Sequence, residues 1–100
     1  MKLLIVTVVK AYEKDMLRLF KEAKIESFST SDIGGFKTAA TVMQTSWFPG
    51  ESAAVESIMY FSFTEDEQVE VLFELLKKFN AAPENNNPAR AVVIDVAKHL

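Results

Sequence analysis

Few residues in this 100-residue chain could carry out catalytic chemistry. The chain has no cysteine, so disulfides, thiolate metal sites and thiol nucleophiles are excluded. His99 is the sole histidine and stands beside the last residue, where a solvated side chain is far more common than a general base. Asp95 falls within a predicted strand, where a carboxylate paired across the sheet or a subunit contact is a simpler interpretation than a ligand role. We find no polar catalytic pair and predict that the protein is not an enzyme.

A binding function would lie in the segment from Ser27 to Ser57, in the loop that follows its first strand. Polar and apolar residues alternate from Ser27 and then meet Gly34 and Gly35, which predicts a strand, up to Lys37, that ends at a special backbone site. The loop over residues 38–54 is mostly small and polar, and Trp47 and Phe48 are its only aromatic residues. Aromatic residues dominate binding hot spots, so this pair could anchor a partner protein. It could equally fold back over the sheet or over a neighbouring subunit.

Composition restricts the class of protein. The net charge is −3 at pH 7 and the only arginines are Arg18 and Arg90, which argues against a surface that neutralises nucleic-acid phosphates. The apolar run from Leu3 to Val9 is too short to span a bilayer and has no cleavage site after it. We therefore expect one cytoplasmic domain over residues 1–100, with no membrane insertion.

Hydrophobic periodicity predicts the elements that position these residues. The run Leu3–Val9 is apolar at nearly every position, as in a central strand. Helical spacing follows over residues 12–24, and strands are expected over residues 27–37, 55–63 and 90–98. Thr64 and Glu67 resemble a capping box that opens a second helix. Its core stripe consists of five residues, Val69, Leu72, Phe73, Leu76 and Phe79.

The order strand, helix, strand, strand, helix, strand predicts an α+β domain of ferredoxin-like βαββαβ type. Its antiparallel sheet carries both helices on one face. We expect Ile58, Tyr60 and one side of the first strand to lie on the other face, which is too apolar to remain in water as one patch. Self-association through the sheet is the simplest way to cover it.

Several of these residues together resemble the PII nitrogen-regulatory signal proteins. The resemblance rests on the apolar first strand with Lys10, the segment Ala23-Lys-Ile25, the strand end Asp32-Ile-Gly-Gly-Phe-Lys37 and the closing strand Arg90–Lys98. It implies a homotrimer with inward-facing sheets and ligand clefts between subunits. The loop over residues 38–54 would dock onto a regulated transporter or metabolic enzyme.

The same resemblance implies where an effector, possibly ATP or ADP, would bind. The positions that correspond to the family's nucleotide site are Ser29, Gly35, Phe36, Lys37 and Arg90. Other positions depart from the family pattern. The loop has no tyrosine to be modified and is shorter than usual, and the arginines that follow the last strand in the family are absent. Residues 84–88 hold a carboxylate and no glycine, which makes a poorer anion cradle.

Two alternatives from other classes stay open. A CutA-like trimer associated with divalent metals belongs to the same wider superfamily, but the single histidine and the lack of cysteine weaken that reading. A small enzyme of the dimeric ferredoxin-like barrel type would need a polar catalytic pair between sheet and helices. Metal titration tests the first alternative, and a dimer in solution would favour the second.

Overall fold

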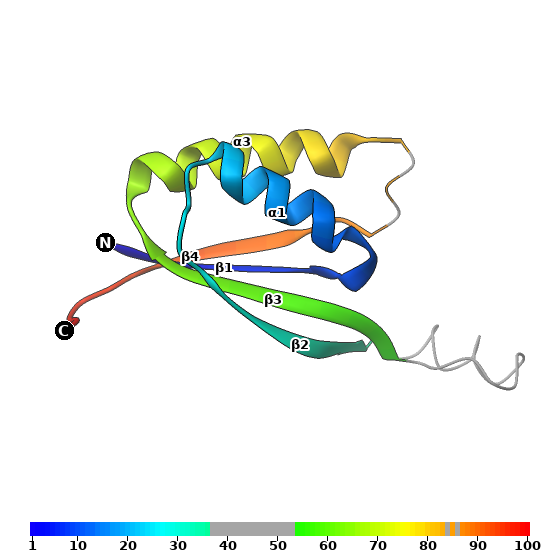
Figure 1. The fold of residues 1–100 in the computed structure, drawn as a ribbon, viewed down its shortest axis with the longest axis horizontal. Coiled ribbons are helices and arrows are strands. Elements are labelled where there is room, and N and C mark those ends of the chain that lie inside the picture. Colours follow the sequence, from blue (N-terminus) through cyan, green and yellow to red (C-terminus); the bar gives the residue numbers. More distant parts are fainter. Residues whose placement is uncertain (37–53, 84, 86) are drawn as a thin grey trace, which may run out of the picture.

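A computed structural model describes residues 1–36, 54–83, 85 and 87–100. The described elements are β1 (Lys2–Val9), a 3₁₀ turn (Lys10–Tyr12), α1 (Glu13–Glu22), β2 (Ser29–Phe36), β3 (Ala54–Thr64), α3 (Asp66–Ala81) and β4 (Arg90–Asp95). The four strands form one antiparallel sheet in the order β2-β3-β1-β4. Both helices cover the same face of that sheet (Figure 1). The chain therefore has the ferredoxin-like α+β architecture expected from its sequence.

The core lies between the sheet and the two helices. Leu4 and Val6 of β1 and Tyr60 of β3 are completely buried there, with Phe20 and Met16 of α1. From α3, Val69, Leu72 and Leu76 are buried, whereas Phe73 and Phe79 are partly buried. The predicted core stripe of the second helix is thus confirmed, because its 3.6-residue period places these side chains on one side.

Our prediction of the sheet face on which Ile58 and Tyr60 lie is wrong. The β1–β3 register pairs Tyr60 with Val6 and Ile58 with Val8, so both side chains point toward the helices and are at most 2% exposed. β3 is apolar on both sides, and its own alternation could not tell which side faces the core. The uncovered face instead carries four exposed apolar side chains, Val55, Phe63, Val92 and Ile94.

Several predicted boundaries also need correction. The strand predicted over residues 27–37 runs from Ser29 to Phe36, and Ala54, expected in the loop, is the first residue of β3. The last strand ends at Asp95 rather than residue 98, because its partner β1 begins at Lys2, which pairs with Asp95. Beyond that pair, the backbone N–H of Val96 still donates to the carbonyl of Met1 at 3.4 Å.

The helix ends differ in detail from the prediction. The N-cap of α3 is Glu65, not Thr64, and its capping box pairs Glu65 with Gln68. The first helix, expected over residues 12–24, spans Glu13–Glu22. It is closed by Lys24, which has a positive φ of 61°. The N–H of Lys24 donates to the carbonyl of Lys21, and that of Ile25 to the carbonyl of Phe20, both at 3.0 Å, which is a Schellman motif.

Candidate functional site

A hollow of about 240 Å³ lies where β1 ends and β4 begins. This is the end of the sheet at which the chain leaves β2 for residues 37–53 (Figure 1). Its described lining comes from all four strands and from the α3–β4 connection. The lining residues are Thr7, Val8, Val9, Ile33, Gly35, Val55, Ser57, Asn87, Pro88 and Arg90. Side chains alternate between the two faces of a strand, and the strand registers show which residues share a face. Four lining residues lie on the face away from the helices: Thr7, Ile33, Ser57 and Arg90.

Arg90 is the single charged residue in the described lining of this hollow. It opens β4 opposite Thr7, and it is exposed. None of the ion pairs found between described residues includes Arg90. A guanidinium offers several donors in a rigid fork that matches a carboxylate or a phosphate. The exposed guanidinium of Arg90 is thus chemically suited to an anion, and its expected role in effector binding stays a prediction.

Gly35 has a packing role in the floor of the hollow. It pairs with Val55 inside the ladder, so β2 continues through the glycines rather than ending there. A Cβ at position 35 would lie 3.2 Å from the hydroxyl oxygen of Ser57 and 3.5 Å from the carbonyl oxygen of Val55. The Ser57 hydroxyl itself donates to that carbonyl at 3.3 Å. A side chain at position 35 would therefore crowd the Ser57 hydroxyl, and no turn is involved.

The structure does not bring Ser29 to the same site. Ser29 pairs with Phe61, and Gly35 pairs with Val55, six residues further along each strand. At the rise of a strand, that separation is about 20 Å. Ser29 and Arg90 both face away from the helices, but they lie on the two opposite edge strands of the sheet, β2 and β4. Within one chain, the predicted effector residues therefore form two separate groups.

The remaining predicted site residues are only partly described. Phe36 is the last residue of β2 and pairs with Ala54. Lys37, Trp47 and Phe48 lie outside the described residues, as do residues 38–53 of the predicted loop.

An asparagine that the sequence analysis missed supports the wall of the hollow. The side-chain amide of Asn80, in the last turn of α3, donates to the carbonyl of Ala89 at 2.9 Å. Its oxygen accepts from the backbone N–H of Ala89 at 2.8 Å. Asn85 donates its side-chain N–H to the carbonyl of Phe79 at 3.2 Å. These bonds set the position from which Pro88 and Arg90 reach the site. An asparagine in a helix's last turn was the available signal.

The described carboxylates near this end of the sheet, Asp32 and Glu56, lie on its other face. Lys10 donates to Asp32 at 3.3 Å, and the hydrogen bond to Asp32 raises the pKa of Lys10, with smaller contributions from the charges of Asp32, Glu56 and Glu13. Asp32 pairs with Ile58, whose side chain points toward the helices. The alternation of strand side chains therefore keeps these acidic groups away from the Arg90 side of the sheet.

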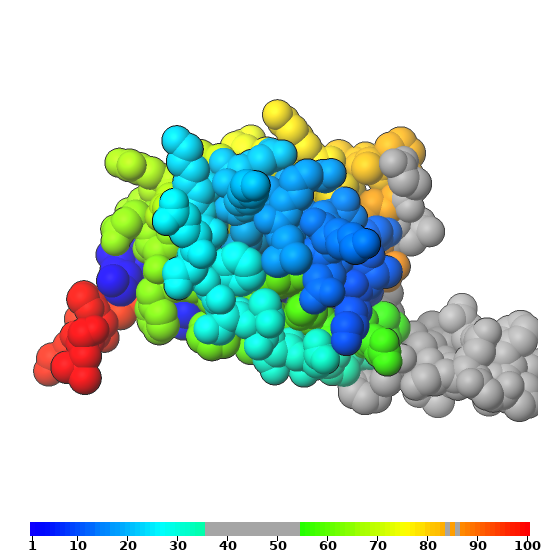
Figure 2. Space-filling view, in the orientation of Figure 1, coloured from blue at the N-terminus to red at the C-terminus, as the bar shows by residue number. Residues whose placement is uncertain are grey.

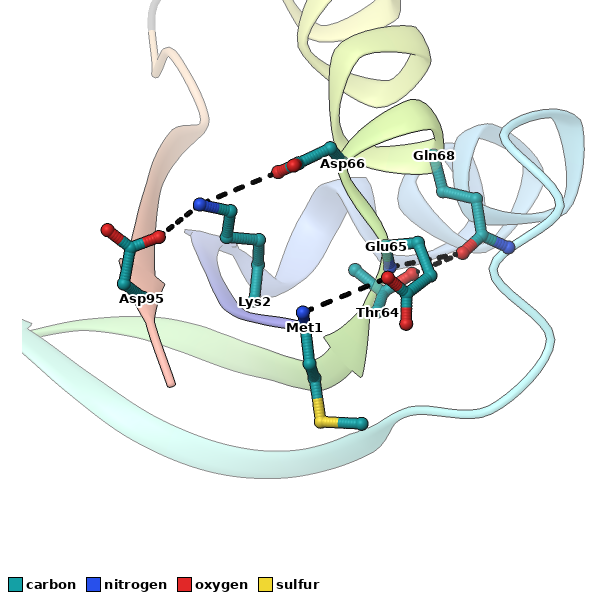
Figure 3. Close-up of polar contacts among 7 residues, drawn as sticks. All are labelled: Met1, Lys2, Thr64, Glu65, Asp66, Gln68 and Asp95. Carbon is teal, nitrogen blue, oxygen red and sulfur yellow. Dashed lines mark hydrogen bonds and ion pairs between the residues drawn. The ribbon is translucent and has the colours of Figure 1, made fainter. Parts of the chain in front are cut away.

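A second polar cluster joins three elements at the opposite end of the sheet (Figure 3). Lys2 forms ion pairs with Asp95 of β4 and with Asp66 of α3, the latter at 3.7 Å. The hydrogen bond from Lys2 lowers the pKa of Asp95 and correspondingly raises that of Lys2. Nearby, the Thr64 hydroxyl donates to the Gln68 side-chain oxygen at 2.6 Å. The expectation that Asp95 is a paired carboxylate is confirmed, with Lys2 as its partner. These groups satisfy one another and form a structural link.

Neither a metal centre nor a membrane-spanning helix is found in the described part of the chain. No group of three or more histidine, cysteine, aspartate or glutamate side chains among the described residues could hold a metal ion. No helix there is both long and apolar enough to cross a bilayer.

Comparison with known proteins gives a structural relationship without a sequence relationship. No protein-family model and no curated protein sequence matches the chain. Among solved structures, the chain resembles CPII, a nitrogen regulatory PII-like protein from Thiomonas intermedia K12, bound to ADP, AMP and bicarbonate. The two superpose with a TM-score of 0.63 at 17% identity over 99% of this chain and 94% of that one. A second CPII structure, bound to ADP and bicarbonate, gives a TM-score of 0.64 at 17% identity over 97% and 88% of the two chains.

The likeness covers nearly the whole chain, whereas the identity is too low to carry over a ligand or a partner. It agrees with the element order and sheet topology observed above. The chain therefore has the fold of the PII-like nitrogen regulatory proteins.

Proposed function

We propose that this protein is a PII-like regulator without enzymatic activity, which binds a small anionic effector beside Arg90 and controls a partner protein through residues 38–54. One observation carries the proposal. The hollow with Arg90 lies at the end of the sheet from which β2 and β3 lead into that segment. Ile33, Gly35, Val55 and Ser57 of the hairpin line the hollow directly. A ligand there would contact the base of the segment that meets the partner.

Assembly as a homotrimer is part of the proposal. Val55, Phe63, Val92 and Ile94 are 42% to 58% exposed on the face of the sheet that no described element covers. Figure 1 shows both helices on the other side of the sheet, and in the space-filling view β2 forms the front lower edge of the molecule (Figure 2). A contiguous apolar face of this kind is typical of a subunit interface. A second copy would also supply the Ser29 group that one chain cannot bring to Arg90.

The effector and the partner follow from the same reasoning. CPII was solved with ADP, AMP and bicarbonate, so adenine nucleotides and bicarbonate are the first candidates for this chain. A transporter or metabolic enzyme of nitrogen metabolism in the cytoplasm is the proposed partner, docked through Trp47 and Phe48.

Light scattering coupled to size-exclusion chromatography tests the assembly. We expect a mass of three chains for the wild-type protein. Val92→Glu would place a charge on the uncovered face and should yield monomers. Val71→Glu is the matched control, because Val71 on α3 is 47% exposed and Val92 is 53% exposed. A monomeric wild-type protein, or one in which both variants behave alike, would contradict the trimer.

Fluorescence of Trp47, the sole tryptophan, tests the sensing step in the same samples. Titration with ATP, ADP and bicarbonate should produce a saturable change if a ligand beside Arg90 acts on residues 38–54. A trimer that binds none of these ligands would contradict effector sensing by nucleotide or bicarbonate. Divalent-metal titration in parallel tests the CutA-like alternative.

A further inference from the structure

We infer that a second hollow, at the C-terminal end of α1, is a docking surface for an acidic segment of a partner protein, which inserts one bulky apolar side chain between flanking carboxylates. The inference goes beyond the proposed function, because it needs neither an effector nor residues 38–54. It depends on the position of this α1 hollow, on its walls, on its apolar lining and on the charge at its rim.

The α1 hollow lies where the chain passes from α1 to β2, at the end of β2 away from residue 37 (Figure 1). Its volume is about 370 Å³, and its described lining residues are Leu17, Lys21, Lys24, Ile25, Glu26 and Phe28. The ring centroid of Phe28 is 4.8 Å from that of Phe20 and 5.8 Å from that of Tyr60, both in the core between sheet and helices. The α1 hollow is therefore on the helix side of the sheet, whereas the apolar face proposed for the trimer is on the other side.

The wall formed by residues 23–28 is held in place by two neighbouring elements. The side-chain N–H of Gln68, on α3, donates to the carbonyl of Lys24 at 2.6 Å. The hydroxyl of Ser62, on β3, donates to the carbonyl of Ser27 at 2.6 Å. Between these bonds, Ile25 is buried. A wall that is already ordered loses little conformational entropy on binding, which favours docking of a short segment.

The lining offers an apolar contact that the fold of one chain does not use. Leu17 is 43% exposed, although its neighbour Met16 is completely buried. Phe28, on the other side of the α1 hollow, is only partly buried. A leucine- or phenylalanine-sized side chain between Leu17 and Phe28 would remove apolar surface of both partners from water.

The rim carries more positive than negative charge. Lys21 and Lys24 line the α1 hollow together with one acid, Glu26. Neither lysine takes part in the ion pairs found between described residues. Backbone N–H groups of the Schellman motif already cap the carbonyls of Phe20 and Lys21, so the ammonium groups are not needed for that purpose. Carboxylates on either side of an apolar group complement this rim.

Lys24 has a side chain where the backbone conformation favours glycine. Its φ of 61° lies in the left-handed region, which a residue with a Cβ adopts at a cost in stability. Backbone strain of this kind clusters at functional sites. A role for the Lys24 ammonium at the rim explains why a lysine stands at this position.

A protein segment fits the charges around the α1 hollow better than an anionic membrane does. The neighbouring helix α3 exposes four acids, Asp66, Glu67, Glu70 and Glu74. A flat anionic bilayer would meet these acids as well as Lys21 and Lys24, whereas a single segment contacts the α1 hollow alone.

The test is a titration of the full chain with short synthetic peptides, followed by amide chemical shifts in NMR. The probe is acetyl-Asp-Glu-Phe-Glu-Asp-amide, and we expect it to shift the amides of Leu17, Ile25 and Phe28 in a saturable way. A control peptide with alanine in place of phenylalanine should bind about 10- to 100-fold more weakly. A second control, with lysine in place of each acid, should not bind.

Matched variants locate the contact. Lys21→Gln should weaken binding about two- to fivefold, whereas Lys78→Gln, at an exposed lysine in the last turn of α3, should bind like wild type. Leu17→Ala should weaken binding about 3- to 10-fold, whereas Val71→Ala, at a residue 47% exposed on α3, should not. Lys24→Gly should weaken binding about two- to fivefold and also raise the melting temperature, so its loss of binding is not a loss of folding.

Several results would overturn the inference. These are the absence of a saturable shift, equal binding of either control peptide, shifts confined to the hollow beside Arg90, and rim variants that bind like their controls. Vesicles of phosphatidylserine and phosphatidylcholine provide the membrane test. Sedimentation with them that is lost in Lys21→Gln and Leu17→Ala, without peptide binding, would overturn the inference and assign the α1 hollow to a lipid surface. The titrations followed by Trp47 fluorescence test the proposed function separately, so either proposal can fail without the other.

Discussion

Replacement of Tyr60 by phenylalanine should stabilise the protein. Tyr60 is completely buried, and its ring lies 5.2 Å from the ring of Phe20 and 5.8 Å from that of Phe28. Its hydroxyl is buried without a hydrogen-bond partner among the described residues. Burial, with a smaller contribution from the charge of Glu13, raises the pKa of Tyr60 to about 12. Tyr60→Phe keeps the ring contacts and removes the one atom that is poorly placed.

The magnitude follows from the cost of an unpaired polar group. A buried hydroxyl without a partner costs about 1–3 kcal/mol. Removing one oxygen also leaves a small void, which offsets part of that gain. We therefore expect a net increase of about 1 kcal/mol in the free energy of unfolding, or a Tm higher by about 4–8 °C for a domain of this size.

Urea denaturation followed by circular dichroism measures this change. The protein concentration is kept the same for all variants, because self-association would otherwise alter the apparent stability. Tyr12→Phe is the control. Tyr12 is partly buried, its ring meets that of Phe79 edge-on at 5.2 Å, and its change should be within about 0.5 kcal/mol. A loss of about 1 kcal/mol or more in Tyr60→Phe would refute the reasoning and mean that the hydroxyl has a partner, such as a buried water.

The pH dependence gives a second check on Tyr60. Its folded pKa of about 12 exceeds the ordinary value of 10.0. Above pH 10 the unfolded chain loses the phenol proton first, so ionisation favours unfolding and stability falls as pH rises toward 12. Tyr60→Phe should show a smaller loss over this range than wild type.

Three further predictions concern the frame of the domain. Lys24→Gly should raise the free energy of unfolding by about 1 kcal/mol, because Lys24 has a positive φ that glycine adopts without strain. Lys21→Gly, within the helix, should lower the free energy of unfolding by about as much, and thermal melts compare the two variants. Asn80→Ala should lower the free energy of unfolding, measured by urea titration, by about 1–3 kcal/mol, because it leaves the backbone N–H and carbonyl of Ala89 unpaired. Asn87→Ala is the control. An equal loss in the two variants would show that the backbone groups of Ala89 find other partners. Lys2 lowers the pKa of Asp95, so the ion pair stabilises the fold above the ordinary carboxylate pKa, and this stabilisation is lost as pH falls through the lowered pKa. Asp95→Asn should therefore reduce the loss of stability at acid pH. An unchanged loss at acid pH would contradict this ion pair.

Secondary structure and fold class could be predicted because local periodicity is strong in this chain. The run in β1, the stripe on α3 and the order of elements each follow from neighbouring residues in the sequence. The boundaries were less accurate, since they depend on partners. β4 ends where β1 has no more residues to pair with it, and α3 begins one residue later than expected because Glu65 and Gln68 form the cap.

The candidate site was predicted in part. Arg90 and Gly35 both line one hollow, whereas Ser29 is outside that lining and lies across the sheet from Arg90, on the opposite edge strand. A resemblance in sequence pattern to a family identifies residues at matching positions. It cannot tell whether one chain brings those residues together or whether two chains do. Asn80 escaped prediction because its role depends on a contact across nine residues with Ala89, which no periodicity reports.

The sequence by itself determined the class of fold, the absence of thiol chemistry and the scarcity of arginine, since these depend on composition and on local pattern. Only the tertiary structure decided which face of the sheet the helices cover. Both sides of β3 are apolar, and a shift of one residue in its register with β1 would exchange them. The observed register places Tyr60 opposite Val6 in the core and exposes Phe63 on the other face, together with the hollow beside Arg90.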